Sequence, residues 1–279
     1  MLIDNLRQTV EANKSVIKPL YLRNLLKEEL QNYILNFIYN SKEYKELIFT
    51  GGTCLRKIYG LPRLSEDLDF DFLSKFSVSK FADDLKKYFW ETLQYKQAET
   101  KISGNGNTVF IKLPVLKSLG FSNEEVLFVR CDFSEESLGS YKLETSSLST
   151  RDFTFFVRNY NLETLFANKI RAFLNRDFFN GDDQEIPFKA RDVFDLVWFL
   201  EKAKKSDRNF TPNWKRLECA FPDKSRNEVL KMVLEKVKNI KESEIKKDLE
   251  PFIESSQSVE AFSESFKEII KNGFEDYLK

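Results

Sequence analysis

The stretch that decides the fold runs from residue 47 to residue 73 and reads LIFTGGTCLRKIYGLPRLSEDLDFDFL. Its apolar start predicts a strand that ends at a pair of glycines, and the residues after the pair predict a short helix. A second predicted strand follows, with an aspartate at every other position. These aspartates are Asp67, Asp69 and Asp71. Because alternate side chains of a strand share a face, the carboxylates point one way and the apolar residues between them point the other.

A row of carboxylates about 6 to 7 Å apart along one strand repels itself unless a cation lies nearby. A divalent metal is the usual cation, and the glycine pair lets backbone N–H groups approach phosphate oxygens. The pattern therefore indicates magnesium-dependent phosphoryl or nucleotidyl transfer, with Asp67 and Asp69 as the metal ligands. An alternative stays open, because an alternating acidic strand can also be a half-solvated edge strand.

Composition limits the classes of protein to consider. Of the 279 residues, 42% are hydrophobic and 32% are charged, which is typical of a globular protein. Lys+Arg and Asp+Glu number 44 each, so an affinity for nucleic acid would require a local basic patch. The absence of histidine excludes Ser-His and Cys-His triads. Three separated cysteines support neither a disulfide framework nor a zinc site, and we expect them in the core.

The first residues, MLID, lack the basic and apolar segments of a signal peptide. No apolar run approaches the length that spans a membrane. The sequence therefore predicts a cytoplasmic protein.

Around the central stretch, the sequence predicts helices and strands in the first half of the chain. Two helices, broken near Pro19, extend to about Asn40, and the second carries an apolar stripe that we expect to cover the sheet. A helix is predicted over 78–93 and strands over 98–102, 108–115, 125–133 and 153–157, with a hairpin turn at 104–107. Asp132, in the strand over 125–133, is a candidate third carboxylate; alternatively it faces solvent or caps a turn.

The second half of the chain is predicted to be mostly helical. In the helix over 161–176, Lys169 lies on the apolar stripe, so it either snorkels to the surface or points into a pocket that attracts positive charge. Residues 179–187 predict a loop. In the helix that follows, Arg191 and Asp195 could form a surface ion pair only. The lysine-rich segment from about residue 206 is either a solvated helical surface or a basic groove for RNA.

Strand, Gly-Gly, short helix and Asp-x-Asp strand is the layout of the nucleotidyltransferase superfamily that includes polymerase beta and the CCA-adding enzymes. More narrowly, GGTCLRKIYG followed by RLSEDLDF resembles the AbiEii/AbiGii toxin family of nucleotidyltransferase-like proteins. ANKIRAFLNR is similar to the family's third motif, a helix with a lysine, and RDVFDL to its fourth, RDxxDL. The four motifs occur in the family's order between residues 51 and 196.

The resemblance implies an α+β fold, with a nucleotidyltransferase-like mixed sheet flanked by helices and then a mostly helical C-terminal domain. The expected domains are residues 1–158, with the N-terminal helices, and residues 159–279, which would contribute the lysine and Arg-Asp motifs to the cleft. The residues expected in catalysis are Asp67, Asp69, Asp132, Lys169 and Asp192. Those expected to bind the nucleotide are Gly51, Gly52, Thr53, Arg63, Ser65, Lys169 and Arg191. Asp195 is expected to be structural.

The implied activity is transfer of a nucleoside monophosphate from a nucleoside triphosphate to an acceptor hydroxyl, with one or two Mg²⁺ ions held by the paired aspartates. The implied acceptor is the 3′ end of tRNA, the implied effect is growth arrest or abortive infection, and the implied partner is a separately encoded antitoxin. Two alternatives stay open. One is a toxin that binds GTP or another triphosphate, or transfers phosphate, without modifying RNA. The other is a non-catalytic interaction module.

Overall fold

The computed structural model describes residues 1–103, 105–122, 124–176, 178–180, 184–186, 188–205 and 210–278. The chain divides into two compact units. The first consists of Met1–Glu136 and Leu143–Asn159, and the second of Ser137–Lys142 and Tyr160–Lys279.

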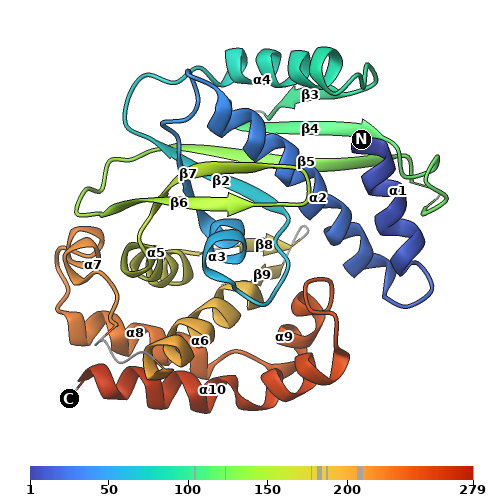
Figure 1. Ribbon diagram of the computed structural model, residues 1–279. Coiled ribbons are helices and arrows are strands. Elements are labelled where there is room, and N and C mark those ends of the chain that lie inside the picture. The colour runs from blue at the N-terminus through green and yellow to red at the C-terminus, as the bar shows by residue number, and fades with distance from the viewer. Residues whose placement is uncertain are drawn as a thin grey trace. The chain divides into compact units, whose positions relative to one another are not determined.

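The first unit is built on a seven-stranded sheet (Figure 1). Its elements are α1 (Leu2–Asn13), α2 (Pro19–Asn40), β1 (Ile48–Thr50), α3 (Gly51–Tyr59), β2 (Asp67–Phe72), α4 (Val78–Lys87), a π-helical turn (Tyr88–Thr92), β3 (Glu99–Ile102), β4 (Thr108–Pro114), β5 (Val126–Glu135), β6 (Leu143–Ser149) and β7 (Thr154–Tyr160). The strand order is β3-β4-β5-β2-β1-β7-β6. Strand β2 is parallel to β5 and antiparallel to β1, and β1 is parallel to β7. The predicted mixed sheet is therefore confirmed.

Stacked aromatic rings fill one face of the central strands. Phe49 of β1, Phe70 of β2 and Phe133 of β5 stack in sequence, with ring centroids 5.5 and 5.7 Å apart. Phe81 of α4 packs edge-on against Phe133, with centroids 4.8 Å apart. Because the apolar residues of β2 fill this core, its aspartates lie on the opposite face, as the alternation predicts. Strand β2 lies between β1 and β5, so the edge-strand alternative is wrong.

Most predicted elements of the first unit are present, with shifted ends. Helix α2 begins at Pro19, where a proline costs no hydrogen bond, and this explains the predicted break. Strands β3 and β4 pair in an antiparallel manner around the predicted hairpin turn, of which Gly104 lies outside the described residues. Strand β6 has no counterpart in the prediction, because the sequence LETSSLS is polar and lies at the edge of the sheet.

The second unit is mainly helical. Its elements are α5 (Leu162–Leu174), β8 (Phe178–Asn180), β9 (Gln184–Ile186), α6 (Ala190–Lys205), α7 (Trp214–Ala220), α8 (Arg226–Lys238), α9 (Glu242–Leu249) and α10 (Ser256–Leu278). Phe166 of α5 stacks on Phe199 of α6, with centroids 4.5 Å apart, and Phe274 of α10 packs beside Phe166. The prediction that the second half of the chain is mostly helical is confirmed.

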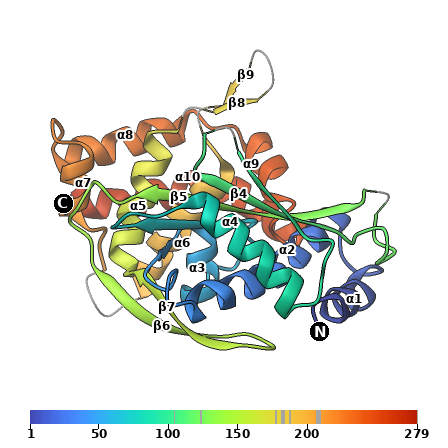
Figure 2. The same ribbon diagram turned by 90° about the horizontal axis from the view of Figure 1, so that it is seen from above.

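Two predictions outside the site are wrong. Residues 178–180 and 184–186 pair as the antiparallel strands β8 and β9 where the sequence predicts a loop (Figure 2); the remainder of that predicted loop, at 181–183 and 187, lies outside the described residues. Cys54 and Cys131 are buried as expected, but Cys219 is exposed. None of the described helices combines the length and the apolar character that crossing a bilayer requires.

Candidate active site

The carboxylate row lies beside a second acidic position on the neighbouring strand. In the parallel pairing of β2 with β5, the Cα partner of Asp69 is Asp132 and the partner of Asp67 is Arg130. Adjacent strands are about 4.8 Å apart, so the sheet brings Asp69 and Asp132 together from positions 63 residues apart in the chain. Asp132 therefore occupies the position expected of a third carboxylate, and its catalytic role stays a prediction.

Arg130 is a member of this cluster that the sequence reasoning did not select. Its Nε lies 2.8 Å from Oδ2 of Asp132. Burial by itself would lower the pKa of Arg130. The negative charges of Asp132, Asp67 and Asp69 outweigh burial and raise this pKa above its ordinary value. Arg130 thus supplies part of the positive charge that the acidic row requires. The alternation of Arg130 with Asp132 is visible in the sequence, but the pairing of β5 with β2 is not.

The first glycine of the pair lies directly against Asp69. Gly51 has φ +74°, a left-handed conformation, and a Cβ at this position would lie 2.0 Å from Oδ2 of Asp69. A side chain here would therefore collide with the carboxylate, in addition to straining the backbone. Glycine at position 51 is required by both the turn and the contact.

Gly52 packs against two predicted phosphate-binding side chains. A Cβ at Gly52 would lie 2.8 Å from Nη2 of Arg63 and 3.0 Å from Oγ of Ser65. Arg63 is 2% exposed and donates from Nη1 to the carbonyl of Leu64 at 2.8 Å. The structure thus brings Arg63 and Ser65 beside Gly52, and their binding to phosphate stays a prediction.

Thr53 has a structural contact. Its buried hydroxyl donates to the carbonyl oxygen of Asp67, which ties α3 to the acidic strand. The first N–H groups of a helix have no acceptor within the helix, and they favour an anion at that end. The backbone N–H groups of Gly51, Gly52 and Thr53, at the start of α3, are therefore suited to phosphate oxygens.

The far end of α3 is fixed to α2 by polar contacts. Arg56 Nε donates to Glu28 Oε1 at 2.9 Å, and Lys57 Nζ donates to Asn32 Oδ1 at 2.6 Å. Burial lowers the pKa of Lys57 to about 8, from 10.5, although Glu28 and Glu29 act against this shift. These contacts hold the helix whose first turn carries the glycine pair.

We expect the free energy of unfolding to rise between about pH 8 and about pH 9.5. In this range the unfolded chain keeps the proton on Lys57 that the folded chain has lost, so higher pH favours the folded state. Urea unfolding across this range measures the effect. Lys57→Met removes the rise, whereas replacement of the exposed Lys45 by methionine keeps it. If the unfolding free energy of Lys57→Met rose by the same amount over this pH range, Lys57 would not be the cause of the rise.

In the second unit, Lys169 of α5 forms ion pairs with two aspartates of α6. Its Nζ lies 3.0 Å from Oδ1 of Asp192 and 2.8 Å from Oδ2 of Asp195. The Lys169 side chain is 13% exposed, so it does not snorkel to the surface. Asp195 is fully buried, so a role in a surface ion pair is excluded. Arg176 Nε also lies 2.8 Å from Asp192, and Arg191 stacks over the ring of Phe252 at 4.3 Å.

Replacing Asp195 by asparagine is expected to lower the free energy of unfolding by about 2 kcal/mol, because the buried ion pair with Lys169 loses its negative charge. Glu201→Ala, which removes an exposed ion pair with Lys204 on the same helix, is the matched control and should cost less than about 0.5 kcal/mol. Urea unfolding of both variants tests the difference. Equal losses of unfolding free energy in the two variants would show that the ion pairs of Lys169 stabilise the fold no more than a surface ion pair does.

The residues of the first unit fit a magnesium ion. Asp67 and Asp69 lie on one face of β2 and offer the carboxylate oxygens that this ion prefers. Among the described residues, no three acidic, cysteine or histidine side chains already form a metal cage. Mg²⁺ commonly binds proteins through one or two carboxylates and completes its shell with water and phosphate oxygens.

A central acidic strand, held against the glycine-rich start of a helix and paired with a third carboxylate, defines a nucleotidyltransferase-type site. A family model described as nucleotidyl transferase AbiEii toxin, type IV toxin–antitoxin system, matches residues 34–278. The chain therefore belongs to the AbiEii family of nucleotidyltransferase toxins. Membership implies a nucleoside triphosphate substrate and a cognate antitoxin.

Solved structures with similar folds include MenT4, a nucleotidyltransferase toxin from Mycobacterium tuberculosis H37Rv. It shares 13% identity with a TM-score of 0.51, over 96% of this chain and 89% of MenT4. JHP933 from Helicobacter pylori shares 16% identity with a TM-score of 0.48, over 91% of this chain and 92% of JHP933. No curated protein is similar enough to the chain to count as a match.

Proposed function

We propose that the protein transfers a nucleoside monophosphate from a nucleoside triphosphate to the 3′-terminal hydroxyl of tRNA, and that this transfer arrests growth, as in abortive infection. The observation that carries the proposal is the contact between the glycine turn and Asp69, with Asp132 in register on the next strand. The proposal is supported because this contact brings the backbone proposed to bind phosphate beside the acidic side chains.

In this proposal Asp67 and Asp69 hold one or two Mg²⁺ ions, which when bound neutralise triphosphate charge and lower the pKa of the acceptor hydroxyl. The N–H groups at the start of α3 bind phosphate oxygens, and Arg63 and Ser65 add further donors beside Gly52. These groups orient the α-phosphorus toward the acceptor.

Asp132 is proposed to take the proton of the acceptor hydroxyl. The hydroxyl oxygen forms a bond to the α-phosphorus as the bond to the bridging oxygen breaks, and pyrophosphate leaves with that electron pair. Asp132 accepts hydrogen bonds from Thr108 Oγ1 and from Arg130, which fix the orientation of its carboxylate. A carboxylate that holds the metal is the alternative base.

In the second unit, Lys169 and Arg191 are proposed to bind the triphosphate, and Asp192 to orient Lys169. Support comes from the match of these residues to the family's lysine and Arg-Asp motifs and from the ion pairs that fix Lys169. We keep Asp195 as a structural member of this cluster, because it is fully buried.

The test is incubation of the protein with tRNA, Mg²⁺ and each α-³²P-labelled triphosphate in turn. Label that appears on tRNA supports the proposal. Binding of the triphosphate without transfer would instead favour a toxin that binds nucleotide without modifying RNA. Absence of magnesium-dependent binding would point to an interaction module.

A further inference from the structure

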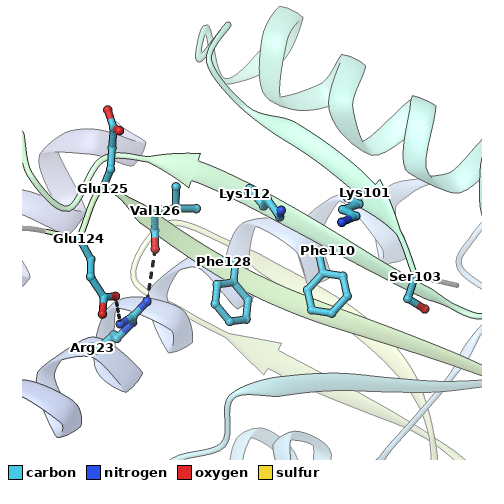
Figure 3. A pocket seen from close by; sticks show the side chains of 9 residues that line it. All are labelled: Arg23, Lys101, Ser103, Phe110, Lys112, Glu124, Glu125, Val126 and Phe128. Carbon is cyan, nitrogen blue, oxygen red and sulfur yellow. Dashed lines mark hydrogen bonds and ion pairs between the residues drawn. The ribbon is translucent and has the colours of Figure 1, made fainter.

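A groove of about 730 Å³ opens in the first unit over strands β3, β4 and β5 (Figure 3). The rings of Phe110 and Phe128 form part of its lining and lie side by side on neighbouring strands. Lys101 and Lys112 flank the rings along one side, and Arg23 lies at one end. Its volume falls in the range of ligand-binding clefts.

This groove lies on the same sheet face as the catalytic aspartates. Phe110 on β4 is the Cα partner of both Lys101 on β3 and Arg130 on β5, and Arg130 is in turn the partner of Asp67 on β2. Lys101, Phe110, Arg130 and Asp67 thus form one row across four strands. With strands about 4.8 Å apart, the row is about 14 Å long. A nucleic-acid strand bound in the groove would therefore need only a few nucleotides to reach the acidic strand β2.

The charges in the groove suit a polyanion. Lys101 and Lys112 form no hydrogen bond or ion pair with any residue that the structure describes. The acidic residues of the lining, Glu124 and Glu125, lie at the other end, where Glu124 is paired with Arg23. Glu99 on β3, which is not part of the lining, is the Cα partner of Lys112. The two lysines are consequently available for phosphate groups.

The rings suit unpaired bases. Phe110 and Phe128 are half-buried, with centroids 5.9 Å apart in an edge-to-face arrangement. The ammonium group of Lys27 already lies 4.8 Å from the Phe128 ring centroid, so Phe110 is the better platform for a further partner. Aromatic platforms beside cations are how proteins bind single-stranded nucleic acid without sequence preference, since every base has a flat apolar face.

We propose that this groove binds the unpaired 3′ strand of the RNA acceptor, with a base stacked on Phe110 and backbone phosphates on Lys101 and Lys112. The proposal rests on the proposed function, because the cross-strand row leads from the groove to Asp67. It adds the binding surface for the acceptor strand.

The experiment measures binding of a fluorescein-labelled single-stranded RNA of 12 nucleotides by fluorescence anisotropy, in EDTA and without triphosphate. Phe110→Leu keeps an apolar side chain but removes the ring, and it should raise the Kd at least about fivefold, the lower end for loss of one stacked base. Phe156→Leu is the matched control, because Phe156 is 69% exposed on β7 outside the groove, and its Kd should equal that of the wild type.

A second readout isolates the lysines. The double variant Lys101→Ala, Lys112→Ala should make the negative slope of log K against log salt shallower by about 1.4. This is about 0.7 for each phosphate of a single strand that a lysine no longer neutralises. A merely structural role for these lysines would leave the slope unchanged.

The proposal is overturned if the wild type does not bind the RNA, if Phe110→Leu binds as tightly as the wild type, or if Phe156→Leu weakens binding equally. These outcomes are separate from the transfer assay. Binding that depends on Phe110 in a protein that transfers no nucleotide would support the groove and refute the proposed function. Transfer of nucleotide to tRNA, together with RNA binding that Phe110→Leu does not weaken, would support the proposed function and refute the groove.

Discussion

Asp69→Ala is expected to lower nucleotide transfer at least about 1,000-fold, equivalent to ~4 kcal/mol of transition-state stabilisation. Asp69 lies against Gly51, beside Asp132, and on the same strand face as Asp67. Its loss removes a proposed metal ligand at the centre of the cluster, and metal-bound charge supplies several kcal/mol in such reactions. Asp67→Ala should have a similar effect. The rate of label transfer from an α-³²P triphosphate to tRNA measures both.

Asp71→Ala is the matched control for these variants. Asp71 lies on the same strand, two residues further along, and its Cα partner on β5 is Ser134, which has no carboxylate. Its transfer rate should stay within about threefold of the wild type. All three variants should unfold at or above the wild-type temperature, because removing one carboxylate from the row relieves repulsion. Activity retained in both Asp67→Ala and Asp69→Ala would refute the assignment of the site.

Gly51→Ala is expected to lower transfer at least about 100-fold. The added methyl group would overlap Oδ2 of Asp69, 2.0 Å away, so either the carboxylate or the start of α3 must move. A displacement of about 1 Å at the reacting groups is sufficient for a loss of this size. The transfer assay measures it, with circular dichroism and urea unfolding to follow the fold.

Gly60→Ala separates the contact from the backbone strain. Gly60 also has a left-handed conformation, with φ +79°, but no atom lies within 4 Å of a Cβ built there. Both variants therefore incur the cost of alanine in this conformation, about 1 kcal/mol. Only Gly51→Ala displaces the carboxylate. If the two variants lose activity equally, the contact between Gly51 and Asp69 has no catalytic importance.

The sequence predicts the local structure at the centre of the candidate site well, because its signals are local. The alternation of Asp67 and Asp69 with apolar residues determines the strand and the face on which the carboxylates lie. The double glycine marks the turn, and the structure shows why, since the Cβ position of Gly51 is occupied by Asp69. These features depend on neighbours within about twenty residues.

What the sequence does not show depends on contacts between distant segments. Arg130 joins the acidic cluster only because β5 pairs with β2 in a particular register, and a single sequence does not specify that register. Strand β6 is polar and at an edge, so it has no period-2 apolar pattern to reveal it. For Lys169, helical spacing left two orientations open, and the ion pairs with α6 decide between them.

The central claim is that Asp67 and Asp69 hold the cations that bind the nucleotide. A crystal structure with Mn²⁺ in place of Mg²⁺ and a non-hydrolysable triphosphate analogue tests it most directly, because manganese is located by its anomalous scattering. We predict an anomalous peak about 2.1 Å from carboxylate oxygens of both aspartates, with phosphate oxygens completing its shell. Manganese bound elsewhere, with both carboxylates directed into bulk solvent, would contradict the claim.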